Sequence, residues 1–309
     1  MSVLEVKHLT KDYGSNRGVF DVSFSIKKGE VYGFLGPNGA GKSTTIRHLM
    51  GFSKPDSGEC KIFGKDCFKN YHNILNNVGY VPGEIALPQG LNGKEFLDMM
   101  AKMYKKDESK RIKELLEYFE LDDASLMINT KRMSLGIKRK LAVITAFAGD
   151  PDVLILDEPT SGLDPLMQER FIALIKEEKK KGKTILLSSH IFSEVDATCD
   201  RIGIIKDGHL VNEFIADDLR HSDKKTYRIH FNDNNNYKKF IALKSSFYDL
   251  IEKHAYSNVV LVSCFDKDIN LLVDLLTKYD VISFSTKKES LQDYFMKFYK
   301  EDQKFGGAL

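Results

Sequence analysis

The fold of this chain is decided by the stretch Gly36-Pro37-Asn38-Gly39-Ala40-Gly41-Lys42-Ser43. The apolar run at residues 31–35 precedes it and has β character, and residues 44–50 read as the start of a helix. Glycines let a backbone curl so that successive N–H groups point inward at phosphate oxygens, and a following helix adds its positive N-terminal end. Strand, glycine loop and helix together therefore predict a phosphate-binding loop.

Lys42 and Ser43 carry the chemistry of this loop, which matches the spacing G-x-x-x-x-G-K-[ST]. The ammonium group of Lys42 can reach the β- and γ-phosphates of a nucleotide. The hydroxyl group of Ser43 can ligate Mg²⁺, which prefers oxygen ligands. A chance glycine-rich turn is the alternative, and the flanking strand and helix argue against it.

A second candidate feature is the apolar run at residues 153–156, which leads directly into Asp157 and Glu158. Two carboxylates at the end of a buried run are unfavourable unless they have partners. Asp157 is suited to holding Mg²⁺, and Glu158 is suited to orienting or deprotonating a water. A solvated Asp-Glu turn is the better interpretation of this segment alone, but the phosphate-binding loop favours the catalytic one.

Strands and helices alternate through the first two thirds of the chain. Apolar residues three and four apart predict helices between residues 93 and 150. Buried strands are predicted at 153–156 and 184–188, with a helix from about Leu166 to Lys181 between them that Gly182 ends. This alternation predicts an α/β fold with a mostly parallel sheet.

The composition changes near residues 217–225, which are polar and charged. Short apolar runs beyond them predict a small α+β domain of about 85 residues. We interpret residues 232–236 as a loop tip. The expected strands are 227–231, 259–264 and 281–285, and the expected helices lie near 269–279 and 290–299.

Length and composition limit the class of protein. A chain of 309 residues suggests about two domains. The formal net charge of +2 argues against a nucleic-acid partner, because such proteins usually have a clear basic excess. No apolar run approaches the roughly 18 residues that span a bilayer, and the first residues lack the apolar core of a signal peptide. We therefore expect a cytoplasmic protein.

With five motifs in order, the chain resembles the ATP-binding subunits of ABC transporters over about residues 1–215. The segment from Met133 to Leu141 is similar to the family signature L-S-G-G-Q. The other motifs are Tyr13-Gly14, Gly36 to Thr44, Asp157 to Pro165 and Ser188-Ser189-His190. The resemblance implies a P-loop NTPase core with an antiparallel β subdomain and a helical subdomain, followed by the small C-terminal domain.

The resemblance also implies ATP and Mg²⁺ as cofactors, and a homodimer that pairs head to tail around two nucleotides. Glu158 would act as general base and His190 would contact the γ-phosphate, so both are expected to be catalytic. Ser43 and Asp157 would hold the metal. Tyr13 would stack on the adenine base. Ser134 and Gly136 would come from the other copy, and Asp164 would bridge the dimer. The remaining nucleotide-binding residues of the first copy would be Gly36, Pro37, Asn38, Gly39, Ala40, Gly41, Lys42, Ser43 and Thr44.

The sequence departs from the family pattern at two places. Gly83 stands where the family has a glutamine that contacts Mg²⁺ and the attacking water, and Glu84 is the alternative source of that contact. In the signature, Leu135 replaces the first glycine and Ile137 replaces the glutamine. The Ser-Leu-Gly form resembles exporter subunits of the antibiotic-resistance and multidrug types.

The resemblance implies an ATPase domain over residues 1–218, with a helical subdomain at about 85–150, and an accessory domain over 224–309. The helical region would dock an integral membrane permease subunit, so the protein would lie on the inner face of the cell membrane and power export. The alternative is a non-transport ABC ATPase that acts on a soluble partner such as the ribosome, although that branch usually has two nucleotide domains in one chain. A kinase or small GTPase is disfavoured because the N-K-x-D motif is missing.

Overall fold

Two compact units make up the chain, residues 1–216 and residues 217–309. The computed structural model describes residues 2–103, 109–220, 223–287 and 291–300. Each unit is described by itself. Within these residues, we find no helix that combines the length and the apolar character needed to cross a membrane.

An antiparallel sheet forms one layer of unit 1. Its strand order is β2-β1-β4-β5. Alternate residues of β1, such as Leu4 and Val6, point into the core and are buried, as expected for a sheet with one face packed. The strands are β1 (Ser2–Asp12), β2 (Gly18–Lys27), β4 (Ser57–Ile62) and β5 (Lys65–Asp66).

The second sheet of unit 1 has six strands in the order β10-β9-β3-β8-β7-β6, and only β10 runs antiparallel to its neighbour. This confirms the predicted mostly parallel sheet. Every residue of β3, β7 and β8 is buried, because helices or the other sheet cover both faces. The strands are β3 (Val31–Leu35), β6 (Val78–Val81), β7 (Val153–Asp157), β8 (Thr184–Ser189), β9 (Arg201–Lys206) and β10 (His209–Ile215).

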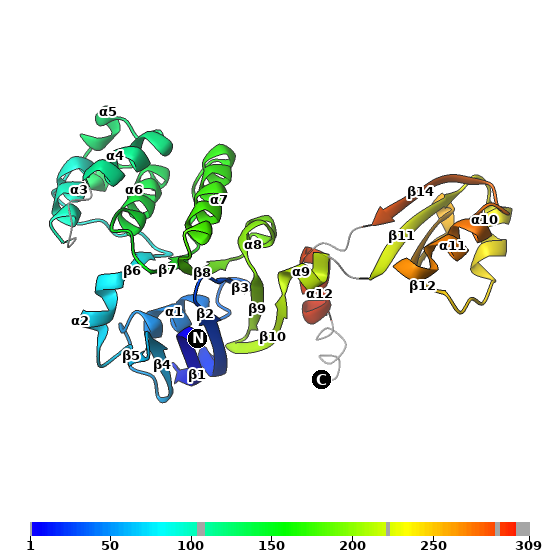
Figure 1. The fold of residues 1–309 in the computed structure, drawn as a ribbon, viewed down its shortest axis with the longest axis horizontal. Helices are drawn as coiled ribbons and strands as arrows, with labels where there is room; N and C mark the ends of the chain where they lie inside the picture. The colour runs from blue at the N-terminus through cyan, green and yellow to red at the C-terminus, as the bar shows by residue number, and fades with distance from the viewer. Residues whose placement is uncertain (1, 104–108, 221–222, 288–290, 301–309) are drawn as a thin grey trace. The chain divides into compact units, whose positions relative to one another are not determined.

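Four helices of unit 1 form a group of their own beside the sheets (Figure 1). They are α3 (Gly93–Ala101), α4 (Ser109–Tyr118), α5 (Asp123–Leu126) and α6 (Leu135–Ala148). The α6 helix contacts α3, α4 and the edge strand β6, so it links this group to the sheet. The other helices of unit 1 are α1 (Lys42–Leu49), α2 (Tyr71–Ile74), α7 (Pro165–Lys180), α8 (Phe192–Thr198) and the 3-10 turns Leu75–Asn77 and Thr130–Arg132. The α9 helix (Ala216–Arg220) begins at the last residue of unit 1.

Unit 2 is an α+β domain with an antiparallel sheet in the order β12-β13-β11-β14. Its aromatic core includes Phe231 and Phe240, and this cluster shares no residue with the core cluster of unit 1. The elements are β11 (Lys224–Phe231), α10 (Asn234–Ile241), β12 (Tyr248–His254), β13 (Val259–Phe265), α11 (Ile269–Leu276), β14 (Val281–Lys287), α12 (Leu291–Lys300) and the 3-10 turns Ala255–Ser257 and Asp266–Asp268.

One expectation about unit 2 is wrong. Residues 232–236 are not a loop tip, because α10 begins at Asn234. Asp233 caps this helix by accepting a hydrogen bond from the backbone N–H of Asn236 at 2.7 Å. The run of asparagines hid the start of the helix, since asparagine is common both in turns and at helix caps.

Candidate functional site

The glycine loop lies at the carboxyl edge of the parallel sheet, between β3 and α1. Gly41 is the N-cap of α1 with φ 109°, a conformation that favours glycine, and no side chain caps the helix. A Cβ atom at Gly36 would lie 2.5 Å from the Ile205 carbonyl oxygen, so the loop has no room for side chains there. The first N–H groups of α1 are thus left for an oxyanion, and the residues present fit a phosphate group.

Lys42 lies inside the curl of this loop and is only 4% exposed. Its Nζ donates hydrogen bonds to the carbonyl oxygens of Gly36 at 2.7 Å and Pro37 at 3.0 Å. The same ammonium group is 3.2 Å from Glu158 Oε1. Because all three partners are oxygens, the ammonium group is already set to pair with an oxygen-rich ligand such as a phosphate.

Asp157 and Glu158 follow one another at the end of β7 but face different partners. Asp157 is 2% exposed and accepts a hydrogen bond from the Ser188 hydroxyl group. Glu158 has φ 47°, which is uncommon outside glycine, and its N–H donates to the Ser188 carbonyl oxygen at 3.0 Å. Left-handed backbone of this kind costs of the order of 1–3 kcal/mol and is concentrated at functional sites.

The carboxylate of Glu158 joins two loops. Its Oε1 is 3.2 Å from Lys42 Nζ, and its Oε2 is 3.2 Å from His190 Nδ1. His190 follows β8 directly and its side chain is 47% exposed. Three side chains from three loops therefore meet at one edge of the sheet, which is where ligands bind in open α/β sheets. A carboxylate beside a phosphate-binding lysine can orient a water for attack on phosphorus.

The predicted metal ligands lie on adjacent elements, since α1, which carries Ser43, contacts β7, which ends at Asp157. A hydroxyl and a carboxylate oxygen are the ligand types that Mg²⁺ prefers, so this donor set fits that metal. A Cβ atom at Gly83 would lie 3.0 Å from Asp157 Oδ2, so the backbone of Gly83 rests directly against this carboxylate. In the described residues, no hydrogen bond or ion pair joins the Glu84 side chain to Asp157.

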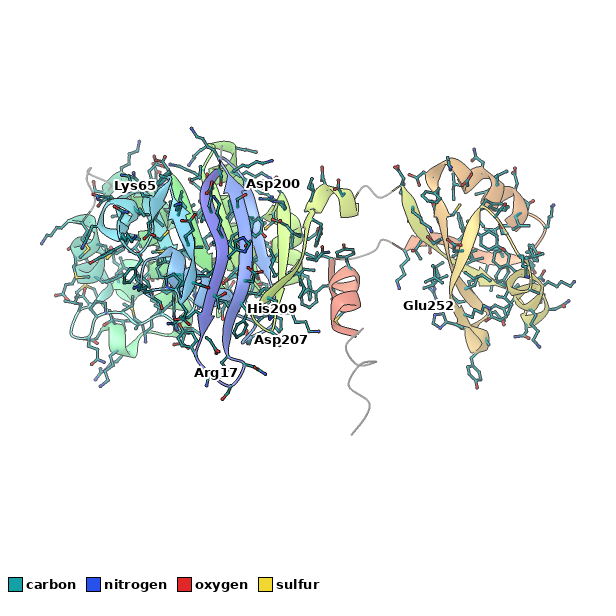
Figure 2. The ribbon with its side chains drawn as sticks, turned by 90° about the horizontal axis from the view of Figure 1, so that it is seen from below. Arg17, Lys65, Asp200, Asp207, His209 and Glu252 are labelled. Carbon is teal, nitrogen blue, oxygen red and sulfur yellow. The ribbon has the colours of Figure 1, made fainter. Side chains whose placement is uncertain are left out.

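Tyr13 stands in the turn between β1 and β2 and its ring is 54% exposed. Lys11 Nζ lies 5.8 Å from the ring centroid. The β9–β10 turn borders the glycine loop, because Gly208 N–H donates to the Ala40 carbonyl oxygen at 3.0 Å. Figure 2 labels Arg17 in the first turn and Asp207 in the second, at the same end of unit 1. An exposed ring near the glycine loop is suited to stacking on a nucleotide base.

Ser134, Gly136 and Asp164 lie elsewhere. Ser134 caps α6 by accepting from the Ile137 N–H at 3.3 Å, and Asp164 caps α7 by accepting from the Met167 N–H at 3.0 Å. A Cβ atom at Gly136 would meet only the Gly162 carbonyl oxygen, at 3.2 Å, and the Ser134 hydroxyl group. Within the part of the chain that the structure describes, no hydrogen bond connects these residues to Lys42 or Glu158. In one copy, ion pairs link Glu158, which follows Asp157, to Lys42 and His190, and the described contacts of Ser134, Gly136 and Asp164 are with other residues.

Two residues near the site were not expected from the sequence. Glu194, on α8, is 2% exposed and accepts hydrogen bonds from the hydroxyl groups of Ser189 at 2.6 Å and Thr160 at 3.3 Å. Burial raises the pKa of this carboxyl group to about 7. Arg139, on α6, is also 2% exposed, and its hydrogen-bond acceptors among the described residues are all backbone carbonyl oxygens. Nothing in the sequence singled out either residue.

Comparisons with known proteins agree with the motifs. The family described as "ABC transporter" matches residues 19–161. The chain is 35% identical over 300 residues to the bacitracin transport ATP-binding protein BcrA of Bacillus licheniformis, covering 96% of this chain and 97% of that protein. It is 39% identical over 213 residues to the linearmycin resistance ATP-binding protein LnrL of Bacillus subtilis, with 68% of each chain covered.

Solved structures share the fold of unit 1. A structure described as an ATP-binding subunit of an ABC transporter superimposes with a TM-score of 0.65 at 33% identity, over 71% of this chain and 92% of that one. A dimeric post-hydrolysis state of the ATP-binding cassette MJ0796 bound to ADP and Pi gives a TM-score of 0.62 at 26% identity, over 69% of this chain and 98% of that one.

Proposed function

The chain belongs to the ABC transporter family as an ATP-binding subunit, and from this we propose how its own residues bind and hydrolyse ATP to power export. The glycine loop and the N-terminus of α1 hold the phosphate groups, and Lys42 pairs with their outer oxygens. Tyr13 stacks on the adenine base. The observation that carries this proposal is the position of the Glu158 carboxylate, 3.2 Å from both the loop lysine and His190.

Glu158 orients the attacking water and accepts its proton. Phosphoryl transfer depends mainly on positioning and on charge stabilisation. The Glu158 carboxylate is already fixed by Lys42 and His190, so it loses little conformational entropy when it orients the water for reaction. His190 contacts the γ-phosphate from the other side of Glu158. Mg²⁺, when bound by Ser43 and Asp157, supplies positive charge to the phosphate oxygens.

A second copy of the chain completes each site. Ser134 and Gly136 begin α6, whose N-terminal end carries partial positive charge and suits a γ-phosphate. Within the described residues, no hydrogen bond joins either to the glycine loop of the same copy, and a two-fold axis would bring each to the loop of the other. Asp164 lies at the end of the loop after Glu158 and would bridge the two copies. The dimeric relative bound to ADP and Pi supports this arrangement.

The membrane partner docks in a groove of unit 1. A cavity of about 610 Å³ lies between the edge strand β6 and helices α3 and α6, and Tyr80, Met100 and Met103 are among its lining residues. Met103 is 67% exposed, and such flexible apolar side chains suit a partner helix. The protein would thus be held at the inner face of the membrane by a permease subunit. From the names of its relatives, we propose an antimicrobial compound as the exported substrate.

Purification with the native membrane fraction tests this function. We expect the wild-type chain to bring down an integral membrane protein and to hydrolyse ATP. Met103→Lys should lose that partner and keep basal turnover within about twofold. Met127→Lys is the matched control, because Met127 is equally open at 63% exposed and lies outside the groove. Recovery of ribosomes in place of a membrane protein would favour a non-transport ATPase.

A further inference from the structure

Arg139 is the largest fully buried side chain among the described residues, and each of its three guanidinium nitrogens donates a hydrogen bond. Nε donates to the Ser161 carbonyl oxygen at 3.0 Å. One Nη donates to the Pro82 carbonyl oxygen at 2.7 Å and the other to the Gly83 carbonyl oxygen at 2.8 Å. A buried arginine that binds only backbone oxygens fixes loop positions, since its fork has a rigid geometry.

These three bonds connect parts of the chain that are distant in sequence. Arg139 belongs to α6, which begins directly after Ser134. Pro82 and Gly83 follow the edge strand β6, and Ser161 lies three residues after Glu158. A shift of α6 is therefore passed by one side chain to both loops that border the acidic strand end.

The loop at Gly83 connects Arg139 to the proposed metal ligand Asp157. The Gly83 backbone rests against Asp157, with only 3.0 Å between a Cβ atom built on Gly83 and Asp157 Oδ2. The glutamine that the family has at this position is absent here, so position 83 has no side chain with which to contact the metal. Arg139 holds this loop in place by donating hydrogen bonds to the carbonyl oxygens of Pro82 and Gly83.

Charge supports the same arrangement. Burial lowers the pKa of the Arg139 guanidinium, and the nearby carboxylates of Asp157 and Glu158 oppose this shift. The arginine thus offers a positive charge behind two acidic groups that would otherwise repel one another near the phosphates.

We propose that Arg139 is a positioning residue that ties α6, and with it Ser134, to the loops beside Asp157 and Glu158, in place of the missing glutamine side chain. This inference rests on the proposed roles of Asp157 and Glu158. When a nucleotide engages Ser134 across the dimer, the position of α6 sets the position of Gly83 and Ser161 through the guanidinium group. Turnover then depends on Arg139, whereas nucleotide binding at the glycine loop does not.

The test compares Arg139→Met with Lys140→Met in the full chain. Both changes remove a cation from α6, but Lys140 makes no hydrogen bond to either loop within the described residues. For Arg139→Met we expect an ATP dissociation constant within about twofold of wild type and a kcat lower by at least tenfold. Hydrogen exchange should quicken at residues 82–84 and 159–162 in this variant, while Lys140→Met behaves as wild type.

Two outcomes overturn the inference. One is a folded Arg139→Met chain with wild-type kcat and wild-type exchange at both loops. The other is a parallel loss of ATP affinity, melting temperature and kcat, which would indicate a purely structural role. If the wild-type chain itself binds ATP without hydrolysing it, the proposed function has failed instead, so the two failures are distinguishable.

A measurement on the wild-type chain keeps the test independent of folding defects. A guanidinium group with three fixed bonds rotates slowly about its C–N bonds, so Arg139 should give separate, exchange-protected Nη signals in nitrogen-15 spectra. Arg139→Lys, which keeps the charge and loses the fork, should fail to restore kcat. Freely rotating Arg139 signals, or full activity of Arg139→Lys, would contradict the proposal.

Discussion

Glu158 combines two features that are rare in one residue, a left-handed backbone and a carboxylate bonded to two side chains. Its φ of 47° turns the chain away from β7, so that Asp157 bonds to Ser188 while Glu158 reaches Lys42 and His190. The strain is held because both neighbours of this turn, β7 and β8, are fully buried. The site is thus set by backbone geometry as much as by residue type.

Glu194 makes stability depend on pH. Its pKa rises from 4.5 to about 7 in the folded chain, so between these values the folded state binds more protons than the unfolded one. The free energy of unfolding should therefore fall as pH rises through this window, by up to about 3 kcal/mol from this group. Glu194→Gln keeps a neutral partner for Ser189 and Thr160 and should flatten that dependence.

Urea unfolding of both chains at about pH 5, 6 and 8 measures this effect. Other titrating groups act equally on both chains, so the difference between the two free energies isolates Glu194. That difference should grow in favour of Glu194→Gln as pH rises and level off above about pH 7. A difference that does not change with pH would contradict a raised pKa at this position.

At the scale of elements, the proposed dimer makes α1 and α6 each supply one half of a site. Lys42→Ala and Ser134→Arg should each abolish turnover in a homodimer. Mixing the two variants should restore about a quarter of wild-type activity, because half of the dimers are mixed and each mixed dimer holds one intact site. The measurement is steady-state ATP hydrolysis at a fixed total concentration.

The control mixes Lys42→Ala with the double variant Lys42→Ala, Ser134→Arg. No pairing in this mixture contains an intact site, so no activity should return. Restored turnover in the control, or none in the main mixture, would mean that Ser134 does not act across the dimer.

The sequence predicts the parts of the site in which ligand binding requires particular residues at neighbouring positions. The glycines at 36, 39 and 41 lie within six consecutive residues, because a continuous curl of backbone binds a phosphate group, and so the loop can be recognised in the sequence. The contacts of Arg139 could not be predicted from the sequence, because its acceptors are backbone oxygens, which every residue has, at 22, 56 and 57 positions away. The start of α10 was missed because Asp233 and the asparagines also suit a turn.

At the scale of the whole molecule, two cores predict two unfolding events. The core clusters of the two units share no residue, so we expect separable transitions in calorimetry. ATP at about 100 times its dissociation constant should stabilise unit 1 by about 2.7 kcal/mol and raise that transition by about 5–10 °C. The transition of unit 2 should stay where it is.

Lys42→Ala is the control for this experiment, because a chain that cannot bind ATP should show no shift in either transition. An equal rise of both transitions in the wild-type chain would mean that the two units unfold together, against the division at residue 216.

The central claim is that two copies close around ATP and that Glu158 then drives hydrolysis. Sedimentation of Glu158→Gln with and without ATP tests it most directly. The variant keeps the size and hydrogen-bonding shape of the side chain but cannot accept a proton, so we expect turnover to fall by at least a hundredfold and an ATP-bound dimer to accumulate. A chain that binds ATP, stays monomeric and hydrolyses ATP at the wild-type rate would contradict the account.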